Sequence, residues 1–165
     1  MGHDKTRAEQ FETLKKLTKD IALCMMTTIE EDGTLRSRPM QAQEVDENGD
    51  LWFFTSDKSG KVSETRLDPR VNLAFASGDR QRYVSVSGTA QLVRDPAKAK
   101  ELWRPLFKAW FKDGLDDPDL ALLRVSIVEA EYWDDETNRM VSFLKMVNSA
   151  VTGAPYDAEH ARLKN

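Results

Sequence analysis

The sequence of 165 residues is short of the side chains that most catalytic centres use. It has two histidines, His3 and His160, both near the ends of the chain, so a histidine-centred triad or a histidine-rich metal site has no plausible scaffold. A Gly-x-Gly-x-x-Gly segment, a Walker sequence and a cysteine pair for zinc are also missing. These absences argue against hydrolases and the common nucleotide and metal sites, and we expect no metal.

Cysteine occurs once, as Cys24 in the apolar segment IALCMM, so no disulfide can form within the chain. Its apolar neighbours indicate a small buried hydrophobic residue and not a redox thiol. A cytoplasmic location is the simplest expectation. No cleavable signal peptide is expected, because the N-terminal segment is charged and has a helical pattern.

Long hydrophobic runs and an excess of positive charge are missing as well. The run from Ile21 to Met26 is far too short to cross a bilayer, so no membrane span is expected. A net charge of -4 argues against broad nucleic-acid binding. With 40% hydrophobic and 32% charged residues, the chain has the composition of a globular protein, and residues 1–165 fit a single domain.

The first half of the chain predicts one helix and three strands. Apolar residues at helical spacing among charges indicate an amphipathic helix over about residues 4–19. The strands are ALCMMTTI, LRSRPMQAQEV and LWFFT, separated by turns at Asp32-Gly33 and Asn48-Gly49. Glycine accepts the positive φ of a tight turn, so we expect three successive antiparallel strands.

The second half predicts a short helix in SGKVSETRLDPR and then further strands in VNLAFA, RYVSVSGTAQLV and LALLRVSIVEAEYWD. Asp95 and Pro96 predict a helix start, and that helix is expected to carry Trp103, Leu106 or Phe107, and Trp110. A last helix is expected from about residue 140, ending in a polar tail. Hairpins without βαβ alternation favour a mainly β fold, a six-stranded antiparallel barrel over about residues 22–133 with peripheral helices.

Positive side chains stand beside two of these elements. Arg38 lies in the second strand, and Lys61 follows the apolar strand in LWFFTSDKSGKVSE. Each lies beside backbone N–H groups that could donate hydrogen bonds to a phosphate. The alternative is that both are ordinary surface cations. The acidic cluster of Asp116, Asp117 and Asp119 is flanked by Gly and Pro and indicates a solvated loop.

The order of several segments resembles a known family. DGTLRSRPMQAQEVDENGDLWFFTSDKSGKVSETRLDPRVNLAFA, then YVSVSGTAQLV, then a Trp-bearing segment, is similar to the pyridoxamine 5'-phosphate oxidase-like FMN-binding split barrels. ELWRPLFKAWFKDGLDDPDLALLRV and EAEYWD resemble the bacterial general stress protein branch. The resemblance extends from about Ala22 to Trp133.

The resemblance implies a homodimer of split barrels with FMN in two interface grooves. It places Arg38 and the Ser-x-Lys pair at the FMN phosphate, and the backbone after Arg38 at the ring. Gly60 stands where the oxidases usually have Arg, so one cation of the common pattern is missing. The residues carried over are Arg38, Pro39, Met40, Phe54, Thr55, Ser59 and Lys61.

Tryptophans 103 and 110 are seven residues apart, which would place both on one face of a helix. In the stress protein branch this helix lies near the flavin, so the resemblance implies that Trp110 preferentially borders the flavin ring. The alternative is that both side chains pack the helix onto the barrel.

The family's substrate-binding residues are not all matched. Gln43 stands where the oxidases have a Lys that grips the substrate phosphate, and the tail EHARLKN lacks their Arg-x-His element. We therefore expect little activity on pyridoxine phosphate. The resemblance implies an FMN-dependent oxidoreductase of an unknown small substrate. The alternatives are a non-catalytic flavin-binding or stress-response protein, or the same fold binding a deazaflavin or haem, although haem lacks a well-placed His.

Overall fold

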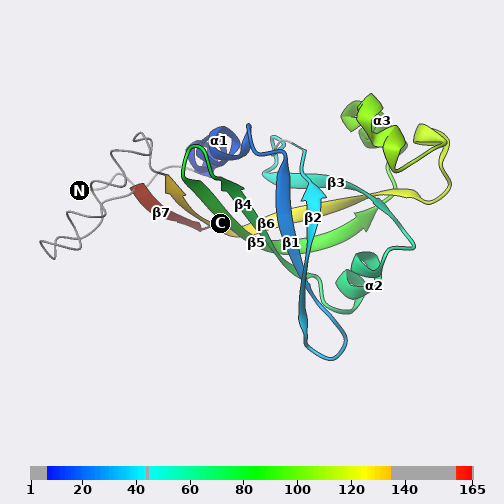
Figure 1. The fold of residues 1–165 in the computed structure, drawn as a ribbon, viewed down its shortest axis with the longest axis horizontal. Coiled ribbons are helices and arrows are strands. Elements are labelled where there is room, and N and C mark those ends of the chain that lie inside the picture. The colour runs from blue at the N-terminus through cyan, green and yellow to red at the C-terminus, as the bar shows by residue number, and fades with distance from the viewer. Residues whose placement is uncertain (1–6, 44, 135–158, 165) are drawn as a thin grey trace, which may run out of the picture.

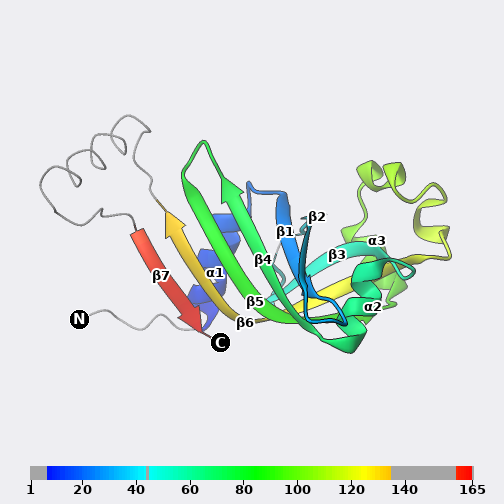
Figure 2. The same cartoon turned by 60° about the horizontal axis from the view of Figure 1, so that its bottom comes forward.

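Antiparallel strands curl into a half-barrel that carries helices at its ends (Figures 1 and 2). The computed structural model describes residues 7–43, 45–134 and 159–164. In chain order, the elements are α1 Arg7–Thr18, β1 Leu23–Ile29, β2 Leu35–Gln41, β3 Asp50–Ser56, α2 Gly60–Leu67, β4 Arg70–Ser77, β5 Arg82–Val93, α3 Pro96–Leu102, η1 Pro105–Ala109, η2 Gly114–Asp116, β6 Leu120–Asp134 and β7 Glu159–Lys164.

The strand order across the sheet is β2-β1-β4-β5-β6-β3. All pairings between the described strands are antiparallel, and β7 pairs with the C-terminal part of β6, from Glu129 to Asp134. The six-stranded antiparallel barrel predicted from the sequence is therefore confirmed. Glycines at both predicted turns have positive φ, 84° at Gly33 and 82° at Gly49, as a tight reversal requires.

The third strand does not continue the first hairpin as expected. β3 and β2 are joined locally, with the Gln43 amide donating to the Trp52 carbonyl over 3.0 Å, but they stand at opposite ends of the strand order. β3 pairs with β6 instead, with Thr55 opposite Ala121. The physical reason is that the turn at Asn48-Gly49 fixes a reversal of the chain but not which strand pairs with β3, and β3 lies instead where both of its faces are buried, with five consecutive buried residues.

The two faces of β3 look into two hydrophobic clusters. Leu51 and Phe53 belong to the main core inside the curled sheet, which α1 closes through Leu14 and Leu17. The opposite face belongs to a smaller cluster under α3 and the turns after it, made of Trp52, Phe54, Ala99, Phe107, Phe111 and Leu122. β3 is therefore held between two layers of apolar side chains.

The helix that begins at Asp95 is shorter than the sequence suggests. Asp95 caps α3 as predicted, since its side chain accepts from the Lys98 amide over 3.0 Å. The helix ends at Leu102, and Trp103 and Arg104 are extended. Pro105 explains this break, because a proline disfavours helical conformation in the residue before it and has no N–H to donate. The expectation of one continuous helix through Trp110 is wrong.

The two ends of the described chain lie close to β6. Arg82 pairs with Asp134 at 3.2 Å, and its Nη1 donates to the Lys16 and Leu17 carbonyls near the end of α1. This buried pair holds α1 to the sheet. The predicted helix from residue 140 falls outside the described residues up to 158, and residues 159–164 form β7, a strand that the sequence did not indicate.

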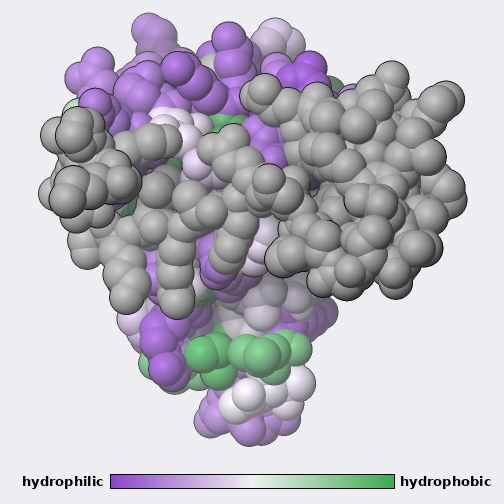
Figure 3. Space-filling model, turned by 90° about the vertical axis from the view of Figure 1, so that its left-hand side faces the viewer, coloured by the Kyte–Doolittle hydropathy of each residue, from purple (hydrophilic) through white to green (hydrophobic). Residues whose placement is uncertain are grey.

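A search of the described helices for a membrane span finds none with the necessary length and apolar character. In Figure 3, which shows one end of the molecule, a group of hydrophobic residues lies toward the lower edge, among mostly hydrophilic residues in the part that is not drawn in grey.

The close approach of β5 and β6 at Gly88 gives a stability prediction. The pairing register shifts between Ser87 and Gly88, and a Cβ at position 88 would lie 2.5 Å from the Ser126 carbonyl oxygen. Gly88→Ala should lower the free energy of unfolding by about 2–3 kcal/mol, because backbone and not a flexible side chain must shift. Urea unfolding followed by circular dichroism measures this.

Gly78→Ala is the matched control, because a Cβ there would meet nothing within 4 Å. Its effect should stay within about 0.5 kcal/mol. Equal stabilities for the two variants would contradict the close approach at Gly88.

Candidate anion-binding site

The site begins where β3 ends and α2 starts. Thr55 is buried at the end of β3, and Ser59 is the N-cap residue of α2 in an extended conformation. Their hydroxyl oxygens are 3.3 Å apart. Within the described chain the Ser59 hydroxyl makes no capping bond to the helix, so the first amides of α2 keep their capacity to donate to an external acceptor.

Arg38 reaches this region from β2, and its side chain is only 18% exposed. Its Nη2 donates to the Glu64 carboxylate at 2.7 Å. Its Nη1 is buried and has no hydrogen-bond partner in the part of the chain that the structure describes. A buried donor without a partner is costly, which marks Nη1 as a group prepared for an acceptor.

Lys61 stands in the first turn of α2 and is half-buried. Burial lowers the pKa of its ammonium group, and the nearby positive charge of Arg38 lowers it further, while Glu64 acts in the opposite direction. Two cations are thus brought together at the start of one helix. Such a pair is unfavourable by itself and becomes favourable when an anion lies against both.

Glu64 is the residue of this region that the sequence analysis missed. It stands on α2 with a side chain that is 12% exposed, and it accepts from Arg38 and from the buried Thr28 hydroxyl. Burial acts to raise its pKa, but the bonds from Thr28 and Arg38 outweigh burial and hold the pKa below the usual value. Its place one turn after Lys61, on a helix that buries Val62 and Thr65, is the signal that could have revealed it.

Pro39 and Met40 follow Arg38 along β2. Pro39 is exposed, and its missing N–H is tolerated because β2 is an edge strand in the described sheet. Met40 turns its side chain into the main core and is 8% exposed. Because its side chain is buried in the core, Met40 can contact a ligand only through its backbone.

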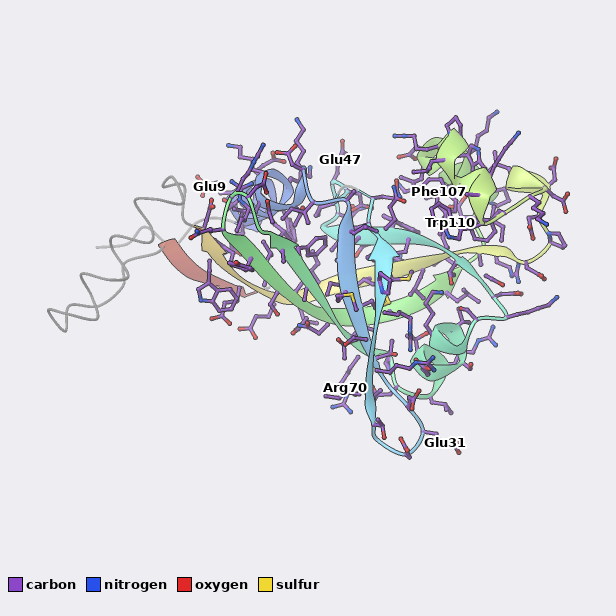
Figure 4. The ribbon with its side chains drawn as sticks, viewed as in Figure 1. Glu9, Glu31, Glu47, Arg70, Phe107 and Trp110 are labelled. Atoms are coloured by element: carbon purple, nitrogen blue, oxygen red, sulfur yellow. The ribbon has the colours of Figure 1, made fainter. Side chains whose placement is uncertain are left out.

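The aromatic residues lie on the smaller cluster beyond β3. Phe54 is buried, with its ring 5.5 Å from Trp103 in an edge-on arrangement and 4.6 Å from Phe107. Trp110 ends η1 and is 64% exposed, on the lobe that also carries Phe107 (Figure 4). The structure therefore separates the two tryptophans, packing Trp103 against the barrel and leaving Trp110 at the surface.

Cys24 takes no part in this chemistry. It is 3% exposed within the main core, and burial raises the pKa of its thiol to about 12. A thiol with that pKa is not a nucleophile at neutral pH. The interpretation of Cys24 as a small buried hydrophobic residue is confirmed.

The donors around Lys61 all suit an oxyanion. A guanidinium N–H, an ammonium group, two hydroxyls and the first amides of α2 can surround a phosphate or carboxylate. Among the described residues, no group of three or more His, Cys, Asp or Glu side chains is placed to hold a metal ion. The arrangement can bind and orient an anionic ligand.

Comparisons with known proteins agree with this architecture. The family model described as "Pyridoxamine 5'-phosphate oxidase like" matches residues 9–157. Protein bli-3 of Neurospora crassa is 33% identical over 141 residues, which cover 79% of this chain and 68% of that protein. The structure of a general stress FMN/FAD binding protein from Xanthomonas citri has a TM-score of 0.67 at 36% identity and covers 79% of this chain and 92% of its own.

A more distant structure shows the same fold over nearly the whole chain. It is a candidate general stress protein 26 from Jannaschia sp. CCS1, with a TM-score of 0.75 at 23% identity. The alignment covers 96% of this chain and 99% of that one. The curled sheet and its peripheral helices are therefore shared well beyond recognisable sequence similarity.

The unfavourable burial of Lys61 gives a second stability prediction. Lys61→Met should raise the melting temperature of the ligand-free protein by about 1–3 °C, because it removes a half-buried charge next to Arg38. The gain should shrink as the pH rises toward the ordinary lysine value of 10.5, since the folded wild-type protein then loses this proton first. Differential scanning calorimetry measures both effects.

Lys100→Met, at an exposed position on α3, is the control and should change the melting temperature by less than about 1 °C. A lower melting temperature for Lys61→Met would show that the two cations do not oppose each other in the folded protein.

Proposed function

The chain belongs to the pyridoxamine 5'-phosphate oxidase-like family, and we propose that it binds FMN as a general stress protein and acts as a flavin-dependent oxidoreductase on a small substrate. The observation that carries the proposal is the buried Nη1 of Arg38, which has no partner among the residues that the structure describes, together with the half-buried ammonium group of Lys61 nearby. Both need an anion, and the phosphate of FMN is one.

The residues present fit a phosphate monoester. Arg38 and Lys61 supply charge, and Thr55, Ser59 and the first amides of α2 supply neutral donors at the junction of β3 and α2. Gly60 leaves room beside them, since a Cβ there would only touch Glu64 at 3.5 Å. The cation that the oxidases usually have at this position is replaced by open space.

When bound, the flavin supplies the capacity for hydride and single-electron transfer. The chain's own part is binding and orientation. The phosphate donors would fix one end of the ligand, and the backbone after Arg38 belongs to β2, an edge strand of the described sheet, where it is proposed to meet the ring. Trp110, exposed on the neighbouring lobe, is proposed to border the ring.

The choice of FMN is supported by the similar protein from Xanthomonas citri, which is described as FMN/FAD binding. A non-catalytic flavin-binding or stress-response protein and a deazaflavin-binding protein are the alternatives. The absorption spectrum of freshly purified protein distinguishes the cofactors, and bleaching of a flavin band by NADH or NADPH favours an oxidoreductase. Little activity on pyridoxine phosphate and a cytoplasmic location stay predictions.

A homodimer with the cofactor at the interface belongs to the same proposal. The outward face of β1, β4 and β5 carries apolar side chains at the surface, with Met25 opposite Ala74 and Ala76 opposite Tyr83. Leu23 is 62% exposed on the same face. A second copy of the chain would remove this surface from water.

The phosphate contact is tested by comparing FMN with riboflavin, which lacks the phosphate. Lys61→Met should weaken FMN binding by about 10- to 100-fold, because a charge-assisted hydrogen bond is lost, and should leave riboflavin binding within about twofold. Isothermal titration calorimetry measures both ligands. Arg66→Met, an exposed arginine on the same helix, is the control and should bind both like wild type.

Equal losses for FMN and riboflavin in Lys61→Met would place Lys61 elsewhere than at the phosphate. Failure of the wild-type protein to bind either flavin would contradict the proposed function itself.

The dimer is tested by Met25→Glu, which puts a charge into the apolar outward face. Light scattering should give wild-type protein a mass of twice the 18.8 kDa chain and the variant a mass near the single chain. Leu67→Glu is the matched control, because Leu67 is 67% exposed on α2, and it should remain dimeric. A monomeric wild-type protein would overturn this part of the proposal.

A further inference from the structure

The contact between Arg38 and Glu64 joins three elements at one point. Glu64 on α2 accepts through Oε2 from Arg38 Nη2 of β2 at 2.7 Å and from Thr28 Oγ1 of β1 at 2.5 Å. Thr28 is fully buried, and the Glu64 side chain is 12% exposed. Figure 1 shows α2 beside the β1–β2 hairpin, where this contact forms.

The contact is not the two-pronged pair that arginine and a carboxylate form when both are free to turn. A bidentate pair would use two guanidinium nitrogens and both carboxylate oxygens. Here Oε2 is shared between Thr28 and Arg38, and Oε1 lies 4.0 Å from Arg36 Nη1. One guanidinium nitrogen is thereby fixed, and Nη1 is left buried without a partner among the described residues.

We propose that Glu64 is a positioning residue of the anion site, which fixes the guanidinium plane of Arg38 so that Nη1 points to the ligand's phosphate. This inference rests on the proposed function. A guanidinium is planar and rigid, so holding Nη2 on an anchored carboxylate determines where Nη1 points. Thr28 is part of the device, because its hydroxyl anchors the carboxylate that holds the arginine.

The alternative role of Glu64 is that of a competitor. A carboxylate next to Arg38 also cancels part of the positive charge that a phosphate needs, and its removal would then strengthen phosphate binding. The two roles predict opposite results when the side chain is deleted. They also differ in what glutamine does, since its amide oxygen still accepts a hydrogen bond but carries no charge.

The experiment compares Glu64→Gln and Glu64→Ala in the full chain, with FMN and riboflavin as ligands in calorimetry. Glu64→Ala should weaken FMN binding by about tenfold or more, while Glu64→Gln should stay within about threefold of wild type. Riboflavin binding should stay within about twofold in both variants, because the effect acts only through the phosphate. If glutamine restores the FMN affinity that alanine loses, then Glu64 acts through its hydrogen bond to Arg38 and not through its charge.

Tighter FMN binding in Glu64→Ala would overturn the proposal in favour of the competitor role. Equal losses for FMN and riboflavin would overturn it in favour of a purely structural role. If Glu64→Ala does not fold, Thr28→Val decides the matter, because valine keeps the volume and removes only the anchor. Thr28→Val should weaken FMN binding several-fold and leave riboflavin binding unchanged. Unchanged FMN binding in this variant would contradict the positioning role of Glu64.

A second arm uses Arg38→Lys, which keeps the charge and loses the planar fork. In this background Glu64→Ala should change FMN binding by less than about twofold, since there is no guanidinium left to orient. A full tenfold loss in both backgrounds would show that Glu64 acts independently of Arg38. Absence of FMN binding in the wild-type protein would contradict the proposed function, whereas normal wild-type binding with an unaffected Glu64→Ala would contradict only the positioning role.

Discussion

The site depends on one electrostatic constraint: two positive side chains, Arg38 and Lys61, lie near the start of the short helix α2. The carboxylate of Glu64 connects that helix to β1 and β2. Arg38 and Lys61 are 23 residues apart in the sequence, and burial and then the positive charge of Arg38 lower the pKa of Lys61. Glu64 offsets part of this effect, because it pairs with Arg38 and raises the pKa of Lys61, and the proposed anionic ligand would offset the rest. A protein that kept both cations for stability alone would pair each of them, and this one leaves a guanidinium nitrogen buried and unused among its described residues.

The apolar strand β3 is what brings these groups together. β3 is buried on both faces and pairs with β6 and not with β2, its neighbour in sequence. The helix α2 that follows it contacts β1 and, through Glu64, Arg38 of β2. Thr55 is the last buried polar residue of β3, and Ser59 opens the helix that follows. The same pairing supports the smaller aromatic cluster on the other side of β3, which holds the lobe with Trp110. Core packing and the site therefore share one element.

The wrong expectations have identifiable physical causes. The prediction of a continuous helix through Trp103 and Trp110 was wrong because the spacing argument ignored Pro105. Its ring and missing N–H disfavour a helix there, and α3 ends at Leu102, one residue before the first tryptophan. The prediction of three successive antiparallel strands was wrong for β3, because turn residues fix a reversal of the chain but not which strand the next one pairs with. Glu64 was missed because an acidic residue on a charged helix carries no mark of burial in its sequence.

Alternation and turn chemistry in the sequence by themselves determined the positions of β1 to β6, the glycine reversals, the start of α3 at Asp95 and the burial of Cys24. These are local properties of residue type and period. Family resemblance in ordered motifs further led to the prediction that Arg38 and Lys61 belong to one site. Only the tertiary structure decided that β3 pairs with β6, that Trp110 is exposed while Trp103 is packed, and that Glu64 and Thr28 hold Arg38. Those facts depend on contacts between residues far apart in the chain, and no local pattern encodes which distant partner wins.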